Sequence, residues 1–325
     1  MDICVPENTV LSLMGPTASG KTAVALALAD RLPIDIISVD SALIYKGMDI
    51  GTAKPERRVL EEYPHGLVDI LDPLQNYSAA RFQKDADQLV KDAFANARLP
   101  VLVGGTSLYF KAFRDGLADM PAADEQIRGE IDAQAKQHGW QSVYEQLQAA
   151  DPQAAKNIHP KNTRRIQRAL EVYRMSGRGI SEFWSQQGAN QTVGKRLGCH
   201  LLECSLEPPR ALLHERIERR FMQMLDAGFQ TEVELLYNRG DLHVDLPAIR
   251  CVGYRQMWAF LQELCSEKEM ILAAQAATRQ LAKRQLTWLR KWPLQLRINP
   301  EEESAIELVL KMIGSAPIVS SSTAV

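Results

Sequence analysis

Two patterns of hydrophobic and polar positions alternate along the chain. Short, continuous apolar runs rich in branched residues predict buried strands at residues 10–14, 34–39, 67–71, 100–103 and 199–205. Longer stretches with apolar residues at helical spacing predict helices at residues 23–28, 78–97, 210–225, 254–264 and 273–290. Strands that alternate with helices indicate an α/β fold, a parallel sheet flanked by helices.

A different pattern occupies the middle of the chain. From about Met120 to Gln187 the sequence is polar with helical spacing, and Gly139, Pro152 and Gly177 interrupt it. We therefore expect an all-α insertion domain at residues 120–198, ending in a polar loop at 188–198. Residues 1–119 and 199–312 would then form the α/β core with its C-terminal helices. We expect disorder beyond Pro300, with residues 313–325 as a disordered tail.

Composition excludes several classes of protein. No apolar run approaches the length of a membrane span, and the acidic N-terminus lacks a secretory segment, so we expect a cytoplasmic protein without membrane contact. The five cysteines form no C-x-x-C pair, which favours reduced thiols over disulfides or structural zinc.

Basic residues are concentrated locally although the net charge is only −2. Residues 270–300 carry six Lys and Arg and no acid, with Trp288 and Trp292 between them, and residues 156–178 carry seven against the single acid Glu171. Such stretches fit a polyanionic partner such as nucleic acid, but solvated helix faces would give the same pattern. The sequence alone does not distinguish a nucleic-acid-binding surface from solvated helix faces.

A phosphate-binding loop follows the first predicted strand. Residues 15–22, GPTASGKT, match G-x-x-x-x-G-K-[ST] between a strand and a helix, which is the context this motif requires. Backbone N–H groups at the helix N-terminus would hold phosphate oxygens, and Lys21 would add a cation. The Thr22 hydroxyl would be a ligand of a phosphate-bound Mg²⁺.

Acidic and basic side chains are expected beside this loop. Asp40 ends the second predicted strand, and the carboxyl ends of parallel strands line the ligand site, although Asp40 could instead cap the next helix. The strand at 100–103 ends in two glycines rather than an acid, which disfavours a nucleotide-hydrolysing motor. Arg216 and Arg220 share a helix face and would bind a second phosphate, unless they pair with nearby glutamates.

Six segments together resemble the bacterial tRNA dimethylallyltransferases, also called tRNA isopentenyltransferases. They occur in order along the chain: GPTASGKT at 15–22, ISVDSALIY at 37–45, MDIGTAKP at 48–55, GGT at 104–106, RALEVY at 168–173 and KRQLTWLR at 283–290. The C-terminal zinc finger of eukaryotic members has no counterpart here.

This resemblance implies transfer of a dimethylallyl group from dimethylallyl diphosphate to the exocyclic amine of the adenosine immediately 3′ of a tRNA anticodon. Asp40 would be the general base, with Thr106 orienting the amine or the bridging oxygen. The diphosphate would be bound by Gly15, Pro16, Thr17, Ala18, Ser19, Gly20, Lys21, Thr22, Arg216 and Arg220. The tRNA would be contacted by Asp40, Ser41, Ala42, Leu43, Thr106, Arg128, Arg164, Arg165, Ile166, Gln167, Arg168, Arg250, Cys251, Val252, Gly253, Tyr254, Arg255, Lys283, Arg284, Gln285, Leu286, Thr287, Trp288, Leu289 and Arg290.

The expected cofactor is Mg²⁺, and the expected partners are tRNA, through its anticodon stem-loop, and dimethylallyl diphosphate, with the protein acting as a monomer. Three other hypotheses for the function remain: a P-loop kinase of small molecules, an isopentenyltransferase acting on free adenine nucleotides, and a non-catalytic RNA-binding protein. A kinase would transfer the γ-phosphate of ATP, whereas a non-catalytic protein would leave the RNA mass unchanged.

Overall fold

A computed structural model describes residues 6–186 and 191–315 of the chain. Its centre is a six-stranded sheet with the order β3-β2-β4-β1-β5-β6, in which every neighbouring pair is parallel. The strands are β1 (Thr9–Met14), β2 (Ile34–Val39), β3 (His65–Gly66), β4 (Leu99–Gly104), β5 (His200–Leu206) and β6 (Leu296–Ile298). The α/β class with a parallel sheet is thus confirmed.

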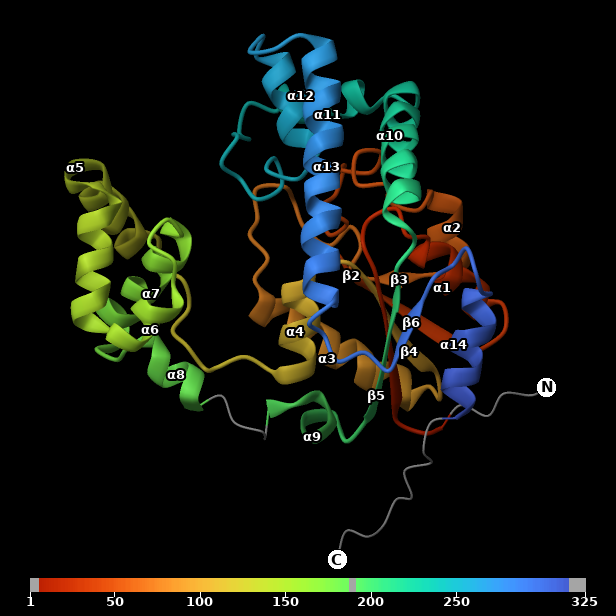
Figure 1. The fold of residues 1–325 in the computed structure, drawn as a ribbon. Helices are drawn as coiled ribbons and strands as arrows, with labels where there is room; N and C mark the ends of the chain where they lie inside the picture. The colour runs from red at the N-terminus through yellow and green to blue at the C-terminus, as the bar shows by residue number, and fades with distance from the viewer. Residues whose placement is uncertain (1–5, 187–190, 316–325) are drawn as a thin grey trace, which may run out of the picture. The chain divides into compact units, whose positions relative to one another are not determined.

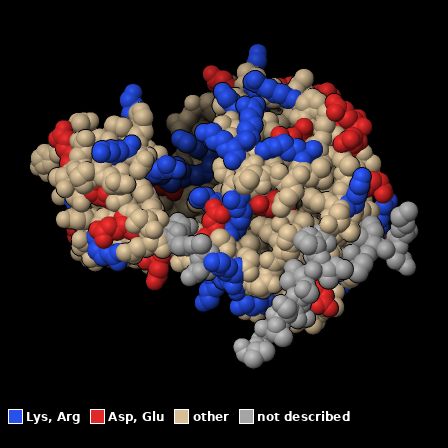
Figure 2. Space-filling view, turned by 60° about the horizontal axis from the view of Figure 1, so that its bottom comes forward, with Lys and Arg blue, Asp and Glu red and all other residues tan. Residues whose placement is uncertain are grey.

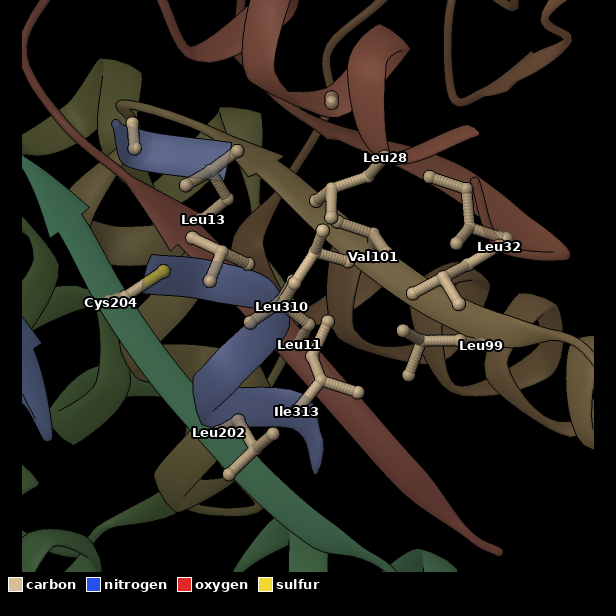
Figure 3. Packing of buried hydrophobic residues seen from close by; sticks show 14 of the residues in the cluster. Leu11, Leu13, Leu28, Leu32, Leu99, Val101, Leu202, Cys204, Leu310 and Ile313 are labelled. Carbon is tan, nitrogen blue, oxygen red and sulfur yellow. The ribbon is translucent and has the colours of Figure 1, made fainter. Parts of the chain in front are cut away.

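Helices cover both faces of the sheet, which explains why its central strands are continuously apolar. One face packs against α1 (Lys21–Ala29) and α14 (Ala305–Gly314), and Figure 3 shows Leu11, Leu13, Val101 and Cys204 of this face among the side chains of both helices. The other face packs against α3 (Ala79–Ala95), α4 (Ser107–Asp115) and the short α9 (Val193–Leu197). Ser78 caps α3, as the sequence predicts, because its side chain accepts a hydrogen bond from Arg81 N–H.

A second helical layer contains α10 (Arg210–Asp226), α11 (Phe229–Tyr237), α12 (Tyr254–Leu261) and α13 (Glu267–Leu289). Figure 1 shows these four helices grouped together. They share an apolar core around Phe229, Tyr254 and Trp258. The long α13 joins the layers, since Met270 lies in this core while Leu289 packs on the sheet face of α3 and α4. Between β2 and β3 lies the short α2 (Arg57–Glu62).

Residues 115–192 form a separate compact unit. Its helices are α5 (Glu125–Ala150), α6 (Pro152–Asn157), α7 (Thr163–Ser176) and α8 (Ile180–Gln186), around a core that includes Ile131 and Ile166. The predicted break at Gly139 is a kink within α5, where Gly139 has φ 80°. Asp124, Asp151 and Asn162 cap the helices that follow them.

Three sequence-based expectations of local structure are wrong. Residues 67–71 are not a strand, because Leu67 and Asp69 adopt positive φ, and the strand pairing falls instead at His65–Gly66. Disorder beyond Pro300 is contradicted by α14, whose Val309 and Ile313 are fully buried. The polar stretch 188–198 includes α9; its residues 188–190 and the tail from 316 lie outside the described residues. Within the described ranges, every helix is too short or too polar to serve as a membrane span.

Candidate active site

A cavity of about 1030 Å³ lies at the carboxyl ends of β1, β2 and β4. The segments that follow these strands line it: residues 17–22 of the phosphate loop, residues 40–43 and residues 104–107. Side chains from α10 and α13 and the segment 250–254 complete the wall. Ligand sites of open parallel sheets occur at this edge, where connections leave a central strand in opposite directions, and β1 lies between β4 and β5.

The phosphate loop is closely packed and carries its lysine folded inward. A Cβ on Gly15 would lie 2.7 Å from Leu206 O and from Ser19 Oγ, so only glycine fits there. Gly20 has φ 93° as it begins α1, a conformation that glycine adopts without strain. Lys21 Nζ donates to Pro16 O at 2.7 Å and to Ser19 Oγ at 3.4 Å. The ammonium group therefore occupies the concavity of the loop that an anion would fill.

The charges in the cavity perturb one another. Burial lowers the pKa of Lys21 to about 8; the Asp40 carboxylate opposes this shift and the Arg220 guanidinium adds to it. Burial also lowers the pKa of Arg220, again opposed by Asp40. Two cations in a poorly solvated space thus face a single carboxylate, an arrangement that favours binding of an anion.

Asp40 and Thr106 lie on neighbouring strand ends. Asp40 Oδ1 accepts from Ala42 N–H at 2.8 Å, and Thr106 Oγ1 accepts from Ser41 N–H at 3.1 Å. Residues 41–45 form a turn rather than a helix, so the alternative in which Asp40 caps the next helix is wrong. Because Thr106 Oγ1 is an acceptor in its bond to Ser41, its hydroxyl proton is left to donate into the cavity.

The two arginines of α10 have different surroundings. Arg216 lines the cavity and pairs with Glu301 at 2.7 Å, which is not one of the glutamates nearest to it in sequence. Arg220 lines the same cavity, and within the described chain it forms no ion pair. Arg220 is accordingly the better placed of the two for a second phosphate.

Oxygen atoms suitable for Mg²⁺ line the cavity. Thr22, which is exposed, and Asp40 are both among the lining residues. The described residues contain no cluster of three or more His, Cys, Asp or Glu that would bind a metal by itself. This donor set fits a hard cation that arrives with phosphate oxygens as further ligands.

A loop that sequence analysis matched only as a family motif forms another wall of the cavity. Gly51, Thr52, Ala53 and Pro55 line the cavity. The Glu232 carboxylate on α11 accepts the N–H groups of Asp49, Ile50 and Gly51 at 2.7–3.1 Å and the Tyr254 hydroxyl at 2.5 Å. Nothing local to α11 in the sequence indicates contact with a loop about 180 residues away, so this role of Glu232 is visible only in the structure.

Many residues predicted to contact tRNA line this cavity or its surroundings. The cavity is lined by residues 40–43, Thr106, residues 250–254, Arg284 and Gln285. The neighbouring positions in sequence include four exposed side chains, those of Arg255, Lys283, Thr287 and Arg290. Three of the predicted side chains are buried: Ile166 and Leu289 belong to apolar cores, and Tyr254, at the cavity, points its hydroxyl at Glu232. Contact of these residues with tRNA stays a prediction. Trp292 is likewise a core residue, whose indole N–H donates to Glu203.

The helical unit presents the other predicted tRNA contacts on α5 and α7. Arg164 and Arg165 are exposed, and within the described ranges they form no ion pair. Arg128 and Arg168 both bind the fully buried Glu171, at 2.9 and 2.8 Å, and Gln167 binds Asp132. Burial alone would raise the pKa of Glu171, but hydrogen bonds from Arg168, Asp124 N–H and Arg128 outweigh it and hold the pKa below its usual value. Figure 2 shows Lys and Arg side chains gathered on the face of the molecule in view.

Comparisons with known proteins give a consistent assignment. A family model described as IPP transferase matches residues 43–292. A tRNA dimethylallyltransferase 2 from Hahella chejuensis is 51% identical over 311 residues, covering 93% of this chain and 94% of that protein. A solved tRNA isopentenylpyrophosphate transferase from Bacillus halodurans is 34% identical with a TM-score of 0.67, and covers 95% of each chain.

One further structure shares the fold alone. A eukaryotic dimethylallyltransferase that acts on tRNA superposes with a TM-score of 0.79 at 22% identity, over 97% of this chain and 82% of that one. The extent of the family match and the 51% identity to a full-length relative establish that the chain belongs to the IPP transferase family, the tRNA prenyltransferases.

Proposed function

We propose that this protein transfers a dimethylallyl group from dimethylallyl diphosphate to the exocyclic amine of the adenosine 3′ of the anticodon in tRNA, releasing diphosphate. The observation that carries the proposal is a single cavity that combines a phosphate loop, an acid at a strand end and basic segments. Family membership supports prenyl transfer to tRNA over phosphoryl transfer.

The leaving group gains negative charge as the allylic carbon–oxygen bond breaks. Backbone N–H groups of residues 20–22, at the helix N-terminus, bind its oxygens, as Lys21 exchanges its bond to Pro16 O for one to phosphate. The Ser19 N–H already donates to Pro16 O. Arg220 of α10, which lines the same cavity, neutralises the second phosphate. These donors stabilise the charge where it develops in the transition state.

The nucleophile is an aromatic amine, which must lose a proton as it forms the new nitrogen–carbon bond. Asp40 accepts that proton, and the bonding electrons of the broken carbon–oxygen bond leave with the diphosphate. The Thr106 hydroxyl, already held by Ser41 N–H, orients the amine or the bridging oxygen. A stacked base cannot reach such a site, so the adenosine enters the cavity flipped out of its stack.

Mg²⁺ would be held by the Thr22 hydroxyl and the diphosphate itself, and would supply additional positive charge to the leaving group. The tRNA contacts divide by chemistry. Exposed Lys283, Arg284, Arg164 and Arg165 bind phosphates, whereas residues 250–253 and 40–43 read the single-stranded loop. The protein acts as a monomer, which light scattering of the free protein and its RNA complex would test.

Mass spectrometry of an unmodified anticodon stem-loop incubated with the protein, Mg²⁺ and dimethylallyl diphosphate tests the reaction directly. We expect a mass increase of one dimethylallyl group at the adenosine, and Asp40→Ala should lower the rate by ~10²–10⁴-fold while RNA affinity is largely kept. Asp226→Asn, an exposed carboxylate at the end of α10, is the matched control and should react like the wild type. Unchanged RNA mass, transfer of labelled γ-phosphate from ATP, or a fully active Asp40→Ala variant would contradict the proposal.

A further inference from the structure

Gln285 joins three parts of the active site through one side-chain amide. Its Oε1 accepts from Thr17 N–H in the phosphate loop at 2.9 Å, and its Nε2 donates to Gly105 O, beside Thr106, at 3.0 Å. A Cβ on Gly105 would lie only 2.3 Å from this Nε2, so the amide is wedged between the loop and the end of β4. Gln285 itself belongs to α13, between Arg284 and Leu286.

The amide is held at a fixed position in space. Three residues before Gln285, Ala282 is buried against α10, and four residues after it, Leu289 is buried on the sheet face, so both neighbouring turns of α13 are anchored. Only a side chain that both accepts and donates can satisfy the Thr17 N–H and the Gly105 carbonyl together. Thr17 N–H is bound to Gln285 and Ser19 N–H donates to Pro16 O at 3.3 Å, so a ligand would be bound by other N–H groups of the loop.

The basic residues that precede Gln285 belong to the same helical turn. Lys283 and Arg284 are exposed, and Arg284 lines the cavity. An RNA backbone that binds them therefore restrains the turn from which the amide reaches the phosphate loop.

We propose that Gln285 is a positioning residue that makes binding of the prenyl diphosphate and binding of tRNA mutually favourable. Its hydrogen bonds from α13 to Thr17 and Gly105 fix the position of the phosphate loop and Thr106 relative to the helix that binds the RNA. The inference rests on the proposed function, since it requires both ligands to occupy this cavity.

The test uses inorganic pyrophosphate as the probe, titrated by calorimetry in the presence and absence of an unmodified anticodon stem-loop. Gln285→Met keeps the length of the side chain but removes both hydrogen bonds. We expect it to weaken pyrophosphate binding about tenfold, the scale of one or two lost hydrogen bonds. The RNA should tighten pyrophosphate binding to the wild type by about fivefold or more, and this enhancement should disappear in Gln285→Met. Gln280→Met, an exposed amide on the same helix, should match the wild type in both measurements.

Steady-state kinetics separate positioning from general damage to the fold. For Gln285→Met the KM for dimethylallyl diphosphate should rise, and because the coupling is reciprocal the KM for RNA at saturating diphosphate should also rise by about the lost coupling factor, fivefold or more. Unfolding of part of the protein would instead lower the amount of active enzyme, and so the apparent kcat, and leave both KM values unchanged. If Gln285→Met proves unstable, hydrogen exchange of residues 15–22 in Gln285→Ala provides the same test, because loss of the Thr17 bond should speed exchange in that peptide.

Wild-type affinity and coupling in Gln285→Met, or unchanged exchange in Gln285→Ala, would overturn the inference. Failure of the proposed function gives a different result: the wild type would bind pyrophosphate yet leave the RNA mass unchanged.

Discussion

The Glu232 carboxylate provides the most demanding test of how the cavity is built. It receives four hydrogen bonds, three from the N–H groups of residues 49–51 and one from the Tyr254 hydroxyl. The first group fixes a loop that lines the cavity, and Tyr254 begins α12 directly after the segment 250–253. Burial raises the pKa of Tyr254, and the adjacent Glu232 carboxylate raises it further, so the hydroxyl stays protonated and acts as a donor.

The cost of removing this carboxylate follows from the groups it would leave without a partner. In Glu232→Ala the Asp49 N–H is exposed and can bind water, whereas Tyr254 is fully buried and the Ile50 and Gly51 N–H groups are partly buried. An unsatisfied buried donor costs about 1–3 kcal/mol, so with partial rehydration we expect a total of about 3 kcal/mol. Tyr254→Phe removes one of the four bonds and should cost about 1 kcal/mol.

Urea denaturation of the full chain measures the loss of stability, and hydrogen exchange of residues 47–55 reports the loop directly. We expect faster exchange in this peptide and a raised KM for dimethylallyl diphosphate in Glu232→Ala. Glu234→Ala is the matched control, because within the part of the chain that the structure describes its carboxylate accepts a hydrogen bond only from Gln230 of the same helix. A Glu232→Ala variant within about 0.5 kcal/mol of the wild type, with unchanged exchange, would refute the reasoning.

Three further predictions concern charge. In the helical unit, Glu171→Gln removes the buried charge with which both Arg128 and Arg168 pair. Breaking a buried ion pair costs about 3–5 kcal/mol. Because both arginines are partly exposed, we expect urea denaturation to show a loss of about 2–3 kcal/mol in the free energy of unfolding. The pKa of Glu171 is lower in the folded protein than in the unfolded chain, so the ionised carboxylate contributes its full stabilisation above the unfolded pKa and loses it as the pH falls through the folded pKa. The free energy of unfolding should therefore depend less steeply on pH below neutrality in Glu171→Gln than in the wild type. Identical pH profiles would contradict this. Lys21, with a pKa of about 8, must be protonated to bind phosphate, so the affinity for pyrophosphate should fall above pH 8 in the wild type and fall less in Lys21→Arg. Calorimetry at fixed Mg²⁺ measures this difference. Parallel curves for the two proteins would show that protonation of Lys21 does not control pyrophosphate binding. Finally, the affinity for the stem-loop should fall steeply with salt, and a fluorescence titration that is flat between low and physiological salt would mean that the basic stretches are only solvated faces.

Local patterns in the sequence predicted the parts of this protein whose structure depends on nearby residues. The phosphate loop, the strand that delivers Asp40 and the Ser78 cap of α3 are each encoded within a few positions, and the structure has each of them there. The strand predicted at 67–71 was wrong because positive φ at Leu67 and Asp69 depends on the neighbouring turn rather than on hydrophobicity. The helix α14 was missed because its apolar face is stabilised by the distant strands β1 and β5.

The fold class, the anion-binding loop and the family resemblance follow from the sequence, because they depend on short-range spacing and on motifs in a fixed order. Packing establishes the other features: Gln285 contacts Thr17 and Gly105, Glu232 holds residues 49–51, and Leu289 and Ile166 are core rather than surface. Hydrogen bonds between residues 180 or more positions apart depend on how the elements pack, and a single chain carries no local pattern that specifies them.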